Sequence, residues 1–194
     1  KELSELLPSN HGYREVIEKL IYLATTTRPD IMAAVDILCQ RTSSPTQRDW
    51  NGIKRVVKNL KCTAQFKLKL PLTENPILVG FPDADRAEDI SGRKSTGGYV
   101  FFYGVGPINC ISCKQGSITC SSTEAEYISA AEACDEIVWL KLLLADLKVD
   151  DPIPITLCED NQSCIRLSLS EKTGGRIKHI DVKHHIIEIC KVKY

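Results

Sequence analysis

The sequence lacks the features that would place the chain in a membrane or in a fibre. No uninterrupted apolar run approaches the roughly 20 residues that a bilayer-spanning helix needs. The first residues contain neither the apolar stretch of a signal peptide nor an initiator methionine, so we expect no export and a fragment or processed product. There is no internal repeat and no low-complexity segment. These absences exclude membrane-spanning and collagen-like proteins.

Cysteine is abundant, but its distribution does not suggest a disulfide framework. The nine cysteines are scattered through strand-like and helix-like segments rather than framing loops. Without an export signal, we expect reduced thiols that are mostly buried as small apolar side chains. Hydrophobic residues make up 43% of the 194 residues, which is ordinary for a chain with a sizeable core. The length fits one large domain, or one domain with a helical appendage.

A net charge of zero conceals an uneven distribution along the chain. Residues 1–70 contain 12 lysines and arginines against 7 acidic residues, whereas residues 71–194 contain 13 against 18. The first part is basic enough to face a polyanion. The second part has a surplus of carboxylates, which could hold cations or keep a surface hydrated.

Helical periodicity dominates the first part. Apolar residues recur at helical spacing over 13–23, a second helix is predicted to open at Pro29, and a third covers 46–60. Opposite its apolar face, the third helix carries Arg48, Lys54, Arg55, Lys58 and Lys61. These cations fit either a solvated helix face or contact with a nucleic-acid backbone.

Strand and helix signals alternate after a predicted linker at 71–76. Apolar runs separated by turn residues predict strands at 77–81, 97–103, 108–113, 117–120 and 152–159. Helices are predicted over 123–148, over 162–169 and from about 179. The long helix can begin with either of two capping-box pairs, Thr123 with Glu126 or Ser121 with Glu124. This order predicts a mixed-sheet α/β domain.

Three carboxylates fall near the predicted ends of these elements. Asp83 is expected to end the first strand, Glu126 to lie in the first turn of the long helix, and Asp160 to follow the next strand. Active sites of open α/β sheets gather outside the carboxyl ends of strands. Clustered carboxylates suit Mg²⁺, and two ions roughly 3.5–4 Å apart can support phosphodiester hydrolysis. Spacing alone equally permits helix caps and solvated loop residues.

Five motifs occur in order along the second part of the chain. They are PDAD at 82–85, GRKSTGGY at 92–99, SSTEAEY at 121–127, EDNQ at 159–162 and KHIDVKHH at 178–185. In this order and spacing they resemble the ribonuclease H domain of copia-type LTR retrotransposon Pol polyproteins. Upstream, 22–31 and Trp50 with Lys54 and Arg55 resemble the segment that follows the reverse transcriptase palm in the same polyproteins.

The resemblance implies a fold, an activity and a site. It implies a ribonuclease H-like mixed sheet flanked by helices over 73–194, preceded by a helical connection or thumb-like segment over 1–72. The implied activity is two-metal hydrolysis, with Mg²⁺ or Mn²⁺, of the RNA strand of RNA–DNA hybrids during reverse transcription. Asp83, Glu126 and Asp160 match the catalytic and metal-binding carboxylates of the family.

The same resemblance implies partners and a location. The expected partners are the RNA–DNA hybrid and the reverse transcriptase portion of the polyprotein, with no membrane, in a cytoplasmic virus-like particle. Hybrids are contacted through backbone and 2′-hydroxyl groups, which favours cations and small polar side chains. The candidates are Arg93, Lys94, Ser95, Thr96, Lys178 and His179. The alternative for each is a solvated loop residue.

Departures from the family pattern support a second hypothesis. Asp181 and Glu188 do not match the fourth carboxylate of the family, and we expect the last strand and helix to be missing. Arg86 stands where the family usually has tryptophan, which places a cation beside the expected metals. The alternative is a catalytically incomplete relic or fragment that retains the fold as a nucleic-acid- or protein-binding module.

The sequence also bears on polymerase activity and on a zinc or redox centre. Asp150 and Asp151 precede Pro152 in a polar turn, so no polymerase activity is expected. Cys110 and Cys113 have metal-ligand spacing, but they lie on a predicted strand without a second pair at zinc-finger distance. A zinc or redox centre on this pair is the third hypothesis.

Overall fold

The computed structural model of the chain describes residues 5–7, 11–71, 73–85, 94–149, 155–169 and 190–193. They belong to two compact units, Lys1–Lys69 and Leu70–Tyr194. The first unit is helical, the second contains a five-stranded sheet, and each has its own hydrophobic core. None of the described helices combines the length and apolar character needed to cross a bilayer.

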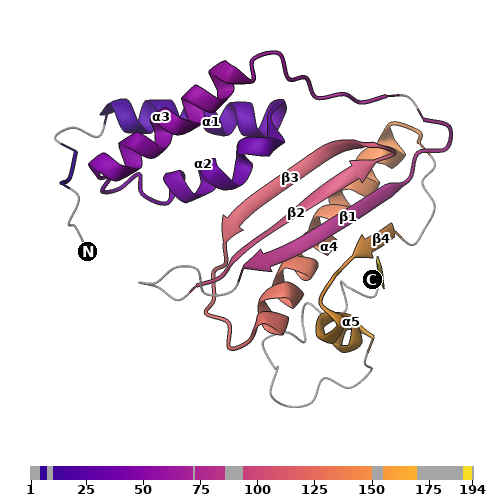
Figure 1. Cartoon of the computed structure of the whole chain (residues 1–194). Helices are drawn as coiled ribbons and strands as arrows, with labels where there is room; N and C mark the ends of the chain where they lie inside the picture. The colour runs from indigo at the N-terminus through magenta and orange to yellow at the C-terminus, as the bar shows by residue number, and fades with distance from the viewer. Residues whose placement is uncertain are drawn as a thin grey trace. The chain divides into compact units, whose positions relative to one another are not determined.

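The described residues of the first unit form three helices and a short 3₁₀ turn (Figure 1). They are α1 (His11–Thr26), η1 (Pro29–Ile31), α2 (Met32–Cys39) and α3 (Gln47–Cys62). Their apolar faces meet in a core that includes Tyr13, Ile17, Leu20, Val35 and Ile53. A capping box begins α3, because the Thr46 N–H donates to the Asp49 carboxylate at 2.9 Å and the Thr46 hydroxyl accepts from the Asp49 N–H.

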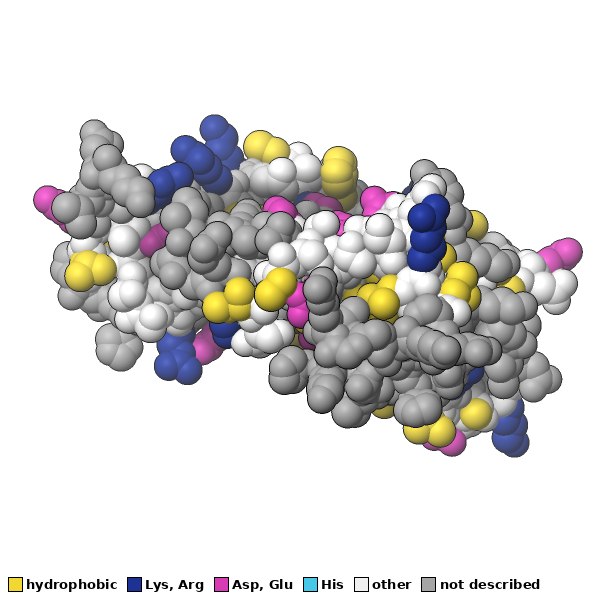
Figure 2. All heavy atoms as spheres, turned by 90° about the horizontal axis from the view of Figure 1, so that it is seen from below, with side chains coloured by type: hydrophobic (Ala, Val, Ile, Leu, Met, Phe, Trp, Pro, Cys, Tyr) yellow, Lys and Arg dark blue, Asp and Glu magenta, His cyan; other side chains and the backbone are white. Residues whose placement is uncertain are grey.

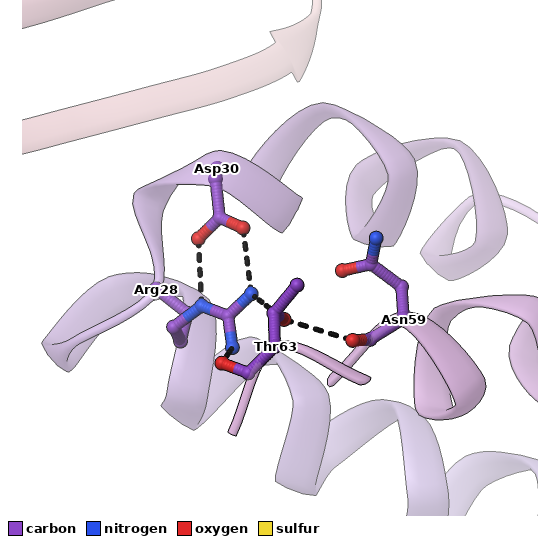
Figure 3. A network of polar contacts seen from close by, with 4 residues as sticks. All are labelled: Arg28, Asp30, Asn59 and Thr63. Atoms are coloured by element: carbon purple, nitrogen blue, oxygen red, sulfur yellow. Dashed lines mark hydrogen bonds and ion pairs between the residues drawn. The ribbon is translucent and has the colours of Figure 1, made fainter. Parts of the chain in front are cut away.

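Arg28 links the end of α1 to the end of α3 (Figure 3). Its Nε and Nη2 donate to the two carboxylate oxygens of Asp30 at 2.8 and 2.7 Å. Nη2 also donates at 2.7 Å to the hydroxyl of Thr63, which in turn donates to the carbonyl of Asn59 at 2.8 Å. The segment predicted to open a helix at Pro29 therefore begins as a 3₁₀ turn, and its acidic residue holds the arginine before it.

The second unit is built on a mixed sheet with strand order β3-β2-β1-β4-β5. Its strands are β1 (Leu78–Asp85), β2 (Thr96–Tyr103), β3 (Gly106–Lys114), β4 (Ile155–Cys158) and β5 (Cys190–Lys193). The first three pair antiparallel, whereas β4 is parallel to β1 and β5 is parallel to β4. With α4 (Ser122–Asp146) across one face and α5 (Gln162–Ser168) after β4, the predicted mixed α/β fold is confirmed (Figure 1).

Close packing between the sheet and α4 defines the core of the second unit. Tyr127, Ala131 and Cys134 of α4 are fully buried in a cluster with Phe101 of β2 and Leu157 of β4. On the face seen in Figure 2, by contrast, the hydrophobic side chains of the described residues lie scattered rather than in one continuous patch. Exposed apolar side chains are nevertheless present elsewhere, for example Trp139 and Leu142 of α4.

The first strand is longer than predicted. We predicted an apolar run over 77–81 that ends at Pro82 and Asp83, but β1 continues through both to Asp85, paired with β2 over its whole length. Among the described residues, β4 pairs with β1 only at Val79 and Gly80. Pro82 is tolerated because it lies where no described strand needs an N–H from that edge.

Two other strand predictions were wrong. Residues 117–120 form an irregular segment, in which Ile118 is exposed and Thr119 is buried. The predicted absence of a further strand is also corrected, since Cys190–Lys193 forms β5 with Val192 buried in the core. Four residues of alternating character give too weak a periodicity to detect. The helix predicted from about 179 lies outside the described residues, as does Arg86.

We predict that Gly80→Ala destabilises the second unit. A Cβ at this position would lie 2.5 Å from the side chains of Phe101 and Leu157, both fully buried, so overpacking should cost about 1–3 kcal/mol in the free energy of unfolding. Gly116→Ala is the matched control, because a Cβ there meets nothing within 4 Å. Equal unfolding midpoints in urea for the two variants would contradict the packing described here.

Candidate metal centre at the end of β4

The N-terminus of α4 is capped in a way that leaves Glu126 available. The Ser121 hydroxyl accepts from the N–H of Glu124 at 3.1 Å, and the Glu124 carboxylate accepts from the N–H of Cys120 at 2.6 Å. Of the two pairs that the sequence allowed, the structure therefore uses Ser121 with Glu124. Glu126 has no part in capping and is 8% exposed, at the sheet side of the helix.

Tethers between α4 and neighbouring segments hold Glu126 in place. The Ser129 hydroxyl donates to the carbonyl of Asp83 at 2.9 Å, and the backbone N–H of Ala84 bonds to the Glu126 carboxylate. Gln115 adds a third tether, since its Nε2 donates to the carbonyl of Ala125 at 2.9 Å. Backbone N–H groups alternate in direction along a strand, so the backbone nitrogens of Pro82 and Ala84 face the same edge of β1. No described strand pairs with that edge at Pro82, so the N–H that proline lacks leaves no hydrogen bond unmade.

Glu159 and Asp160 reach the same place from β4, which ends one residue before them. Side chains alternate along a strand, so Glu159 continues the inward side of Ile155 and Leu157 and is only 1% exposed. Asp160, one residue on, is exposed. The N–H of Asn161 donates to Oε1 of Glu159 at 3.0 Å.

The acidic trio of Glu126, Glu159 and Asp160 forms a compact oxygen cluster. One carboxylate oxygen from each lies within 4.8 Å of the others. Oε2 of Glu126 and Oε2 of Glu159 are buried and have no hydrogen-bond partner among the described residues. Buried polar atoms are normally partnered, because an unpaired one loses its hydration without replacement. A bound cation would supply the missing partner to both oxygens.

Burial and mutual repulsion raise the pKa of both buried acids. Desolvation is the main cause of the rise of the Glu126 pKa to about 7, followed by the charges of Glu159, Asp83 and Asp160. Desolvation also raises the pKa of Glu159 to about 7, against the opposing N–H of Asn161. Near neutral pH the pair therefore gains from taking up either a proton or a cation.

Asp83 lies at the border of this cluster rather than within it. It is exposed on β1, between the buried Pro82 and the half-buried Ala84. Its side chain therefore projects from the face of the strand opposite to that of Pro82 and Ala84. Its charge still raises the pKa of both Glu126 and Glu159. Of the three predicted carboxylates, the structure thus brings Glu126 and Asp160 together and leaves Asp83 beside them.

Glu159 is the member that our sequence prediction missed. The EDNQ motif contributes Asp160 to the predicted site and leaves Glu159 without a role. The signal was nevertheless present, because the alternation of Ile155, Leu157 and Glu159 places an acid at an inward position.

The residues predicted to contact a hybrid are placed differently from one another. Lys94 is near the surface and its amine donates to the carbonyl of Gly116 at 2.6 Å. Ser95 is fully buried and shares a 2.7 Å hydrogen bond with the hydroxyl of Thr119, so it has no surface to offer a duplex. Thr96 begins β2 opposite Asp85. Arg93, Lys178 and His179 lie outside the described residues.

The third hypothesis, a zinc or redox centre on Cys110 and Cys113, does not agree with the strand geometry. Both residues lie on β3 in regular pairing with β2, three positions apart, and therefore point to opposite faces of the sheet. Within the described ranges, the acidic trio is the one group of three or more potential metal ligands. Its ligands are all carboxylates, which suit Mg²⁺ or Mn²⁺ rather than a thiolate-bound metal.

We predict that the metal-free chain becomes less stable as the pH rises from about 5 to about 8. The folded-state pKa of Glu126 and Glu159, about 7, exceeds the ordinary value of 4.5, so the folded state binds more protons than the unfolded state between these values. Stability contributed by the protonated forms is present below pH 4.5 and lost as the pH passes 7. The melting temperature in EDTA should fall by on the order of 5 °C. The double variant Glu126→Gln/Glu159→Gln should show a flatter profile, and an identical slope would contradict the assignment.

We also predict that Mn²⁺ raises the melting temperature more at pH 8 than at pH 5.5. Metal and protons compete for the same carboxylates, so the metal is favoured once the protons have left. The matched control is Asp135→Asn, on the exposed side of α4, which should respond like the parent. Asp160→Asn should lose most of the response. A shift of the same size in the parent and in Asp160→Asn would count against metal binding at this cluster.

Comparison with known proteins identifies the relatives of this chain. The retrovirus-related Pol polyprotein from transposon TNT 1-94 of Nicotiana tabacum is 38% identical over 175 residues, covering 90% of this chain and 13% of that protein. The corresponding polyprotein from transposon RE2 of Arabidopsis thaliana is 36% identical over 181 residues, covering 93% and 12%. The secreted RxLR effector protein 161 of Plasmopara viticola is 40% identical over 131 residues, covering 68% and 92%. No family model matches.

Solved structures give weaker likenesses. LC11-RNase H1, isolated from compost by a metagenomic approach, has a TM-score of 0.46 and 15% identity, covering 62% of this chain and 84% of that one. The foamy viral protease-reverse transcriptase, solved with dsDNA, has a TM-score of 0.36 and 15% identity, covering 100% and 41%.

Similarity to the transposon proteins extends over about nine tenths of the chain. In turn, the chain spans only 12–13% of the length of those two polyproteins. We conclude that the chain belongs to the retrovirus-related Pol polyproteins of transposons.

Proposed function

We propose that the second unit is a ribonuclease H that hydrolyses the RNA strand of RNA–DNA hybrids with divalent cations. The observation that carries the proposal is the pair of buried, unpartnered carboxylate oxygens on Glu126 and Glu159, beside Asp160. The motifs around Asp83, Glu126 and Asp160 and the membership of the Pol polyproteins support the same activity.

The carboxylates have distinct tasks in this proposal. Glu126, Glu159 and Asp160 hold the cations, and Asp83 adds its exposed carboxylate from β1. Bound divalent cations, two in number and Mg²⁺ or Mn²⁺ by ligand type, supply polarisation of the phosphate and activation of water. Ser129 contributes by fixing α4 against the backbone of β1.

The number of carboxylates bears on whether the site is complete. The sequence offers no match to the fourth carboxylate of the family, but Glu159 adds a buried acid that the motif comparison did not count. Asp83 lies beside these three carboxylates, close enough for its charge to raise the pKa of Glu126. This arrangement supports hydrolysis over the alternative of a binding module without catalysis.

Two wider proposals rest on the motifs rather than on the geometry. We assign the chain to the copia type, acting during reverse transcription with the reverse transcriptase portion of its polyprotein as partner. Its place of action is then a cytoplasmic virus-like particle.

We predict that the chain cleaves the RNA strand of a labelled RNA–DNA hybrid in Mg²⁺ or Mn²⁺. Asp160→Asn and Glu126→Gln should each reduce cleavage by about 100-fold, because each removes a charged oxygen from the cation site. Asp83→Asn tests whether the exposed carboxylate belongs to the site. The measurement is the rate of product formation at saturating enzyme.

Asp135→Asn serves as the control for this experiment, since it removes an acid from α4 outside the cluster. It should cleave at the parental rate. Binding of the hybrid without cleavage by the parent, in either metal, would favour the binding module instead. Full cleavage by Asp160→Asn would sink the proposed site.

A further inference from the structure

The C-terminal half of α4 carries a stripe of apolar side chains that its core leaves exposed. The apolar stripe consists of Val138, Trp139, Leu142, Leu143 and Leu147, whose exposed fractions lie between 39% and 64%. At 3.6 residues per turn, these side chains share one arc of about 180° around the helix. Ile137, Leu140 and Leu144 occupy the other side and are buried in the core. This half of α4 is therefore apolar on both sides.

A helix with apolar side chains all round is normally covered all round. Single exposed apolar residues are ordinary on a protein surface, but the apolar stripe brings five of them together within ten residues. At roughly 100 Å² for each large side chain, the stripe offers roughly 500 Å², as much as the largest patches on most monomeric proteins. Patches of this size are commonly interaction surfaces.

Two polar groups within the stripe indicate a second copy of the chain as the partner. Asp146 is exposed near the middle of the arc and has no ion pair among the described residues. Trp139 lies two turns earlier on the same side, and its indole N–H is a hydrogen-bond donor. If two stripes pack antiparallel about a two-fold axis between Leu142 and Leu143, Trp139 of each copy faces the partner's Asp146. The stripe is therefore complementary to itself.

Other arrangements fit the stripe less well. A parallel pair would place the two Asp146 carboxylates side by side, where they repel, and would also align the two helix dipoles unfavourably. A lipid surface would have to take up the same carboxylate at the middle of the apolar arc, whereas helices that lie on membranes keep acidic groups on their polar face. The antiparallel pair is the arrangement that gives the acid a donor.

We propose that the chain forms a weak homodimer in which the apolar stripes of two α4 helices pack antiparallel. Leu142 and Leu143 meet at the two-fold axis, and Trp139 donates its indole N–H to the partner's Asp146. Glu126 lies about 24 Å along the helix from Leu142, so the dimer leaves the acidic trio accessible and does not depend on the proposed hydrolysis. Two stripes would bury roughly 1,000 Å² in total, which is typical of a weak and reversible association.

The test is sedimentation equilibrium of the full chain, without nucleic acid, in EDTA and a thiol reductant. EDTA prevents metal ions from bridging two acidic trios, and the reductant prevents disulfides between the exposed Cys62 and Cys120 of different copies. We expect the average mass to rise from one chain to two over about 1–300 µM, with a Kd on the order of 10–100 µM. A mass of one chain throughout this range would contradict the proposal.

Leu142→Glu should break the dimer, because it places two carboxylates beside the two-fold axis and takes them out of water. The matched control is Leu169→Glu, the same change at an exposed leucine of the same unit outside the stripe. We expect the Kd to rise at least about 100-fold in Leu142→Glu and to stay within about twofold in the control. Equal losses in both variants would overturn the proposal. So would a melting temperature lowered in Leu142→Glu alone at concentrations where the parent is monomeric, since the chain's own residues would then cover the stripe.

A double-mutant cycle tests the antiparallel register. Trp139→Phe removes the indole N–H and keeps an aromatic ring, whereas Asp146→Ala removes the acceptor. Each should raise the Kd about 10-fold, because each leaves one partner of a charge-assisted hydrogen bond unpaired. The double variant should be no weaker than the single variants, since all three lack the same hydrogen bond. Additive losses, or no loss in either single variant, would rule out the proposed pairing.

Discussion

The close approach of α4 to β1 is the constraint on which the second unit depends. Gly97 makes this approach possible, because a Cβ there would collide with the hydroxyl of Ser129. That hydroxyl instead reaches past β2 to the carbonyl of Asp83, while the N–H of Ala84 meets Glu126. Gly97 and Ser129 thus set how closely α4 packs against the sheet, and thereby where the Glu126 carboxylate lies beside the end of β1.

The two units handle charge in opposite ways. In the second unit, the carboxylates of Glu126 and Glu159 are buried and repel each other, and binding of a proton or a cation would remove that repulsion. In the first, Arg28 is nearly buried but fully satisfied by Asp30 and Thr63, so it contributes to the fold rather than to binding (Figure 3). Only an unsatisfied charge predicts a ligand, and this criterion separates the acidic trio from the arginine cluster.

Periodicity and turn chemistry were enough to predict the mixed sheet, the long helix and the three-helix start of the chain. What they missed depends on contacts between distant segments. Pro82 stops a strand by local rules, and it is tolerated only because β4 has already left that edge. The sequence around Ser95 is typical of a polar loop, yet Ser95 is buried and its hydroxyl is hydrogen-bonded to that of Thr119. Glu159 was accessible to strand alternation, but its lack of a partner is visible only in three dimensions.

The unequal pairing of β1 has a consequence for local dynamics. Its first residues have neighbours on both sides, whereas its last residues, around Asp83, are paired with β2 alone among the described strands. Backbone hydrogen exchange should therefore slow toward Leu78 and quicken toward Asp85 within a single strand. The hydrogen bonds that join Asp83 to Ser129 and Ala84 to Glu126 lie at this loosely paired end, so fraying of a few residues of β1 would release the Glu126 carboxylate while the core around Phe101 and Leu157 stays closed.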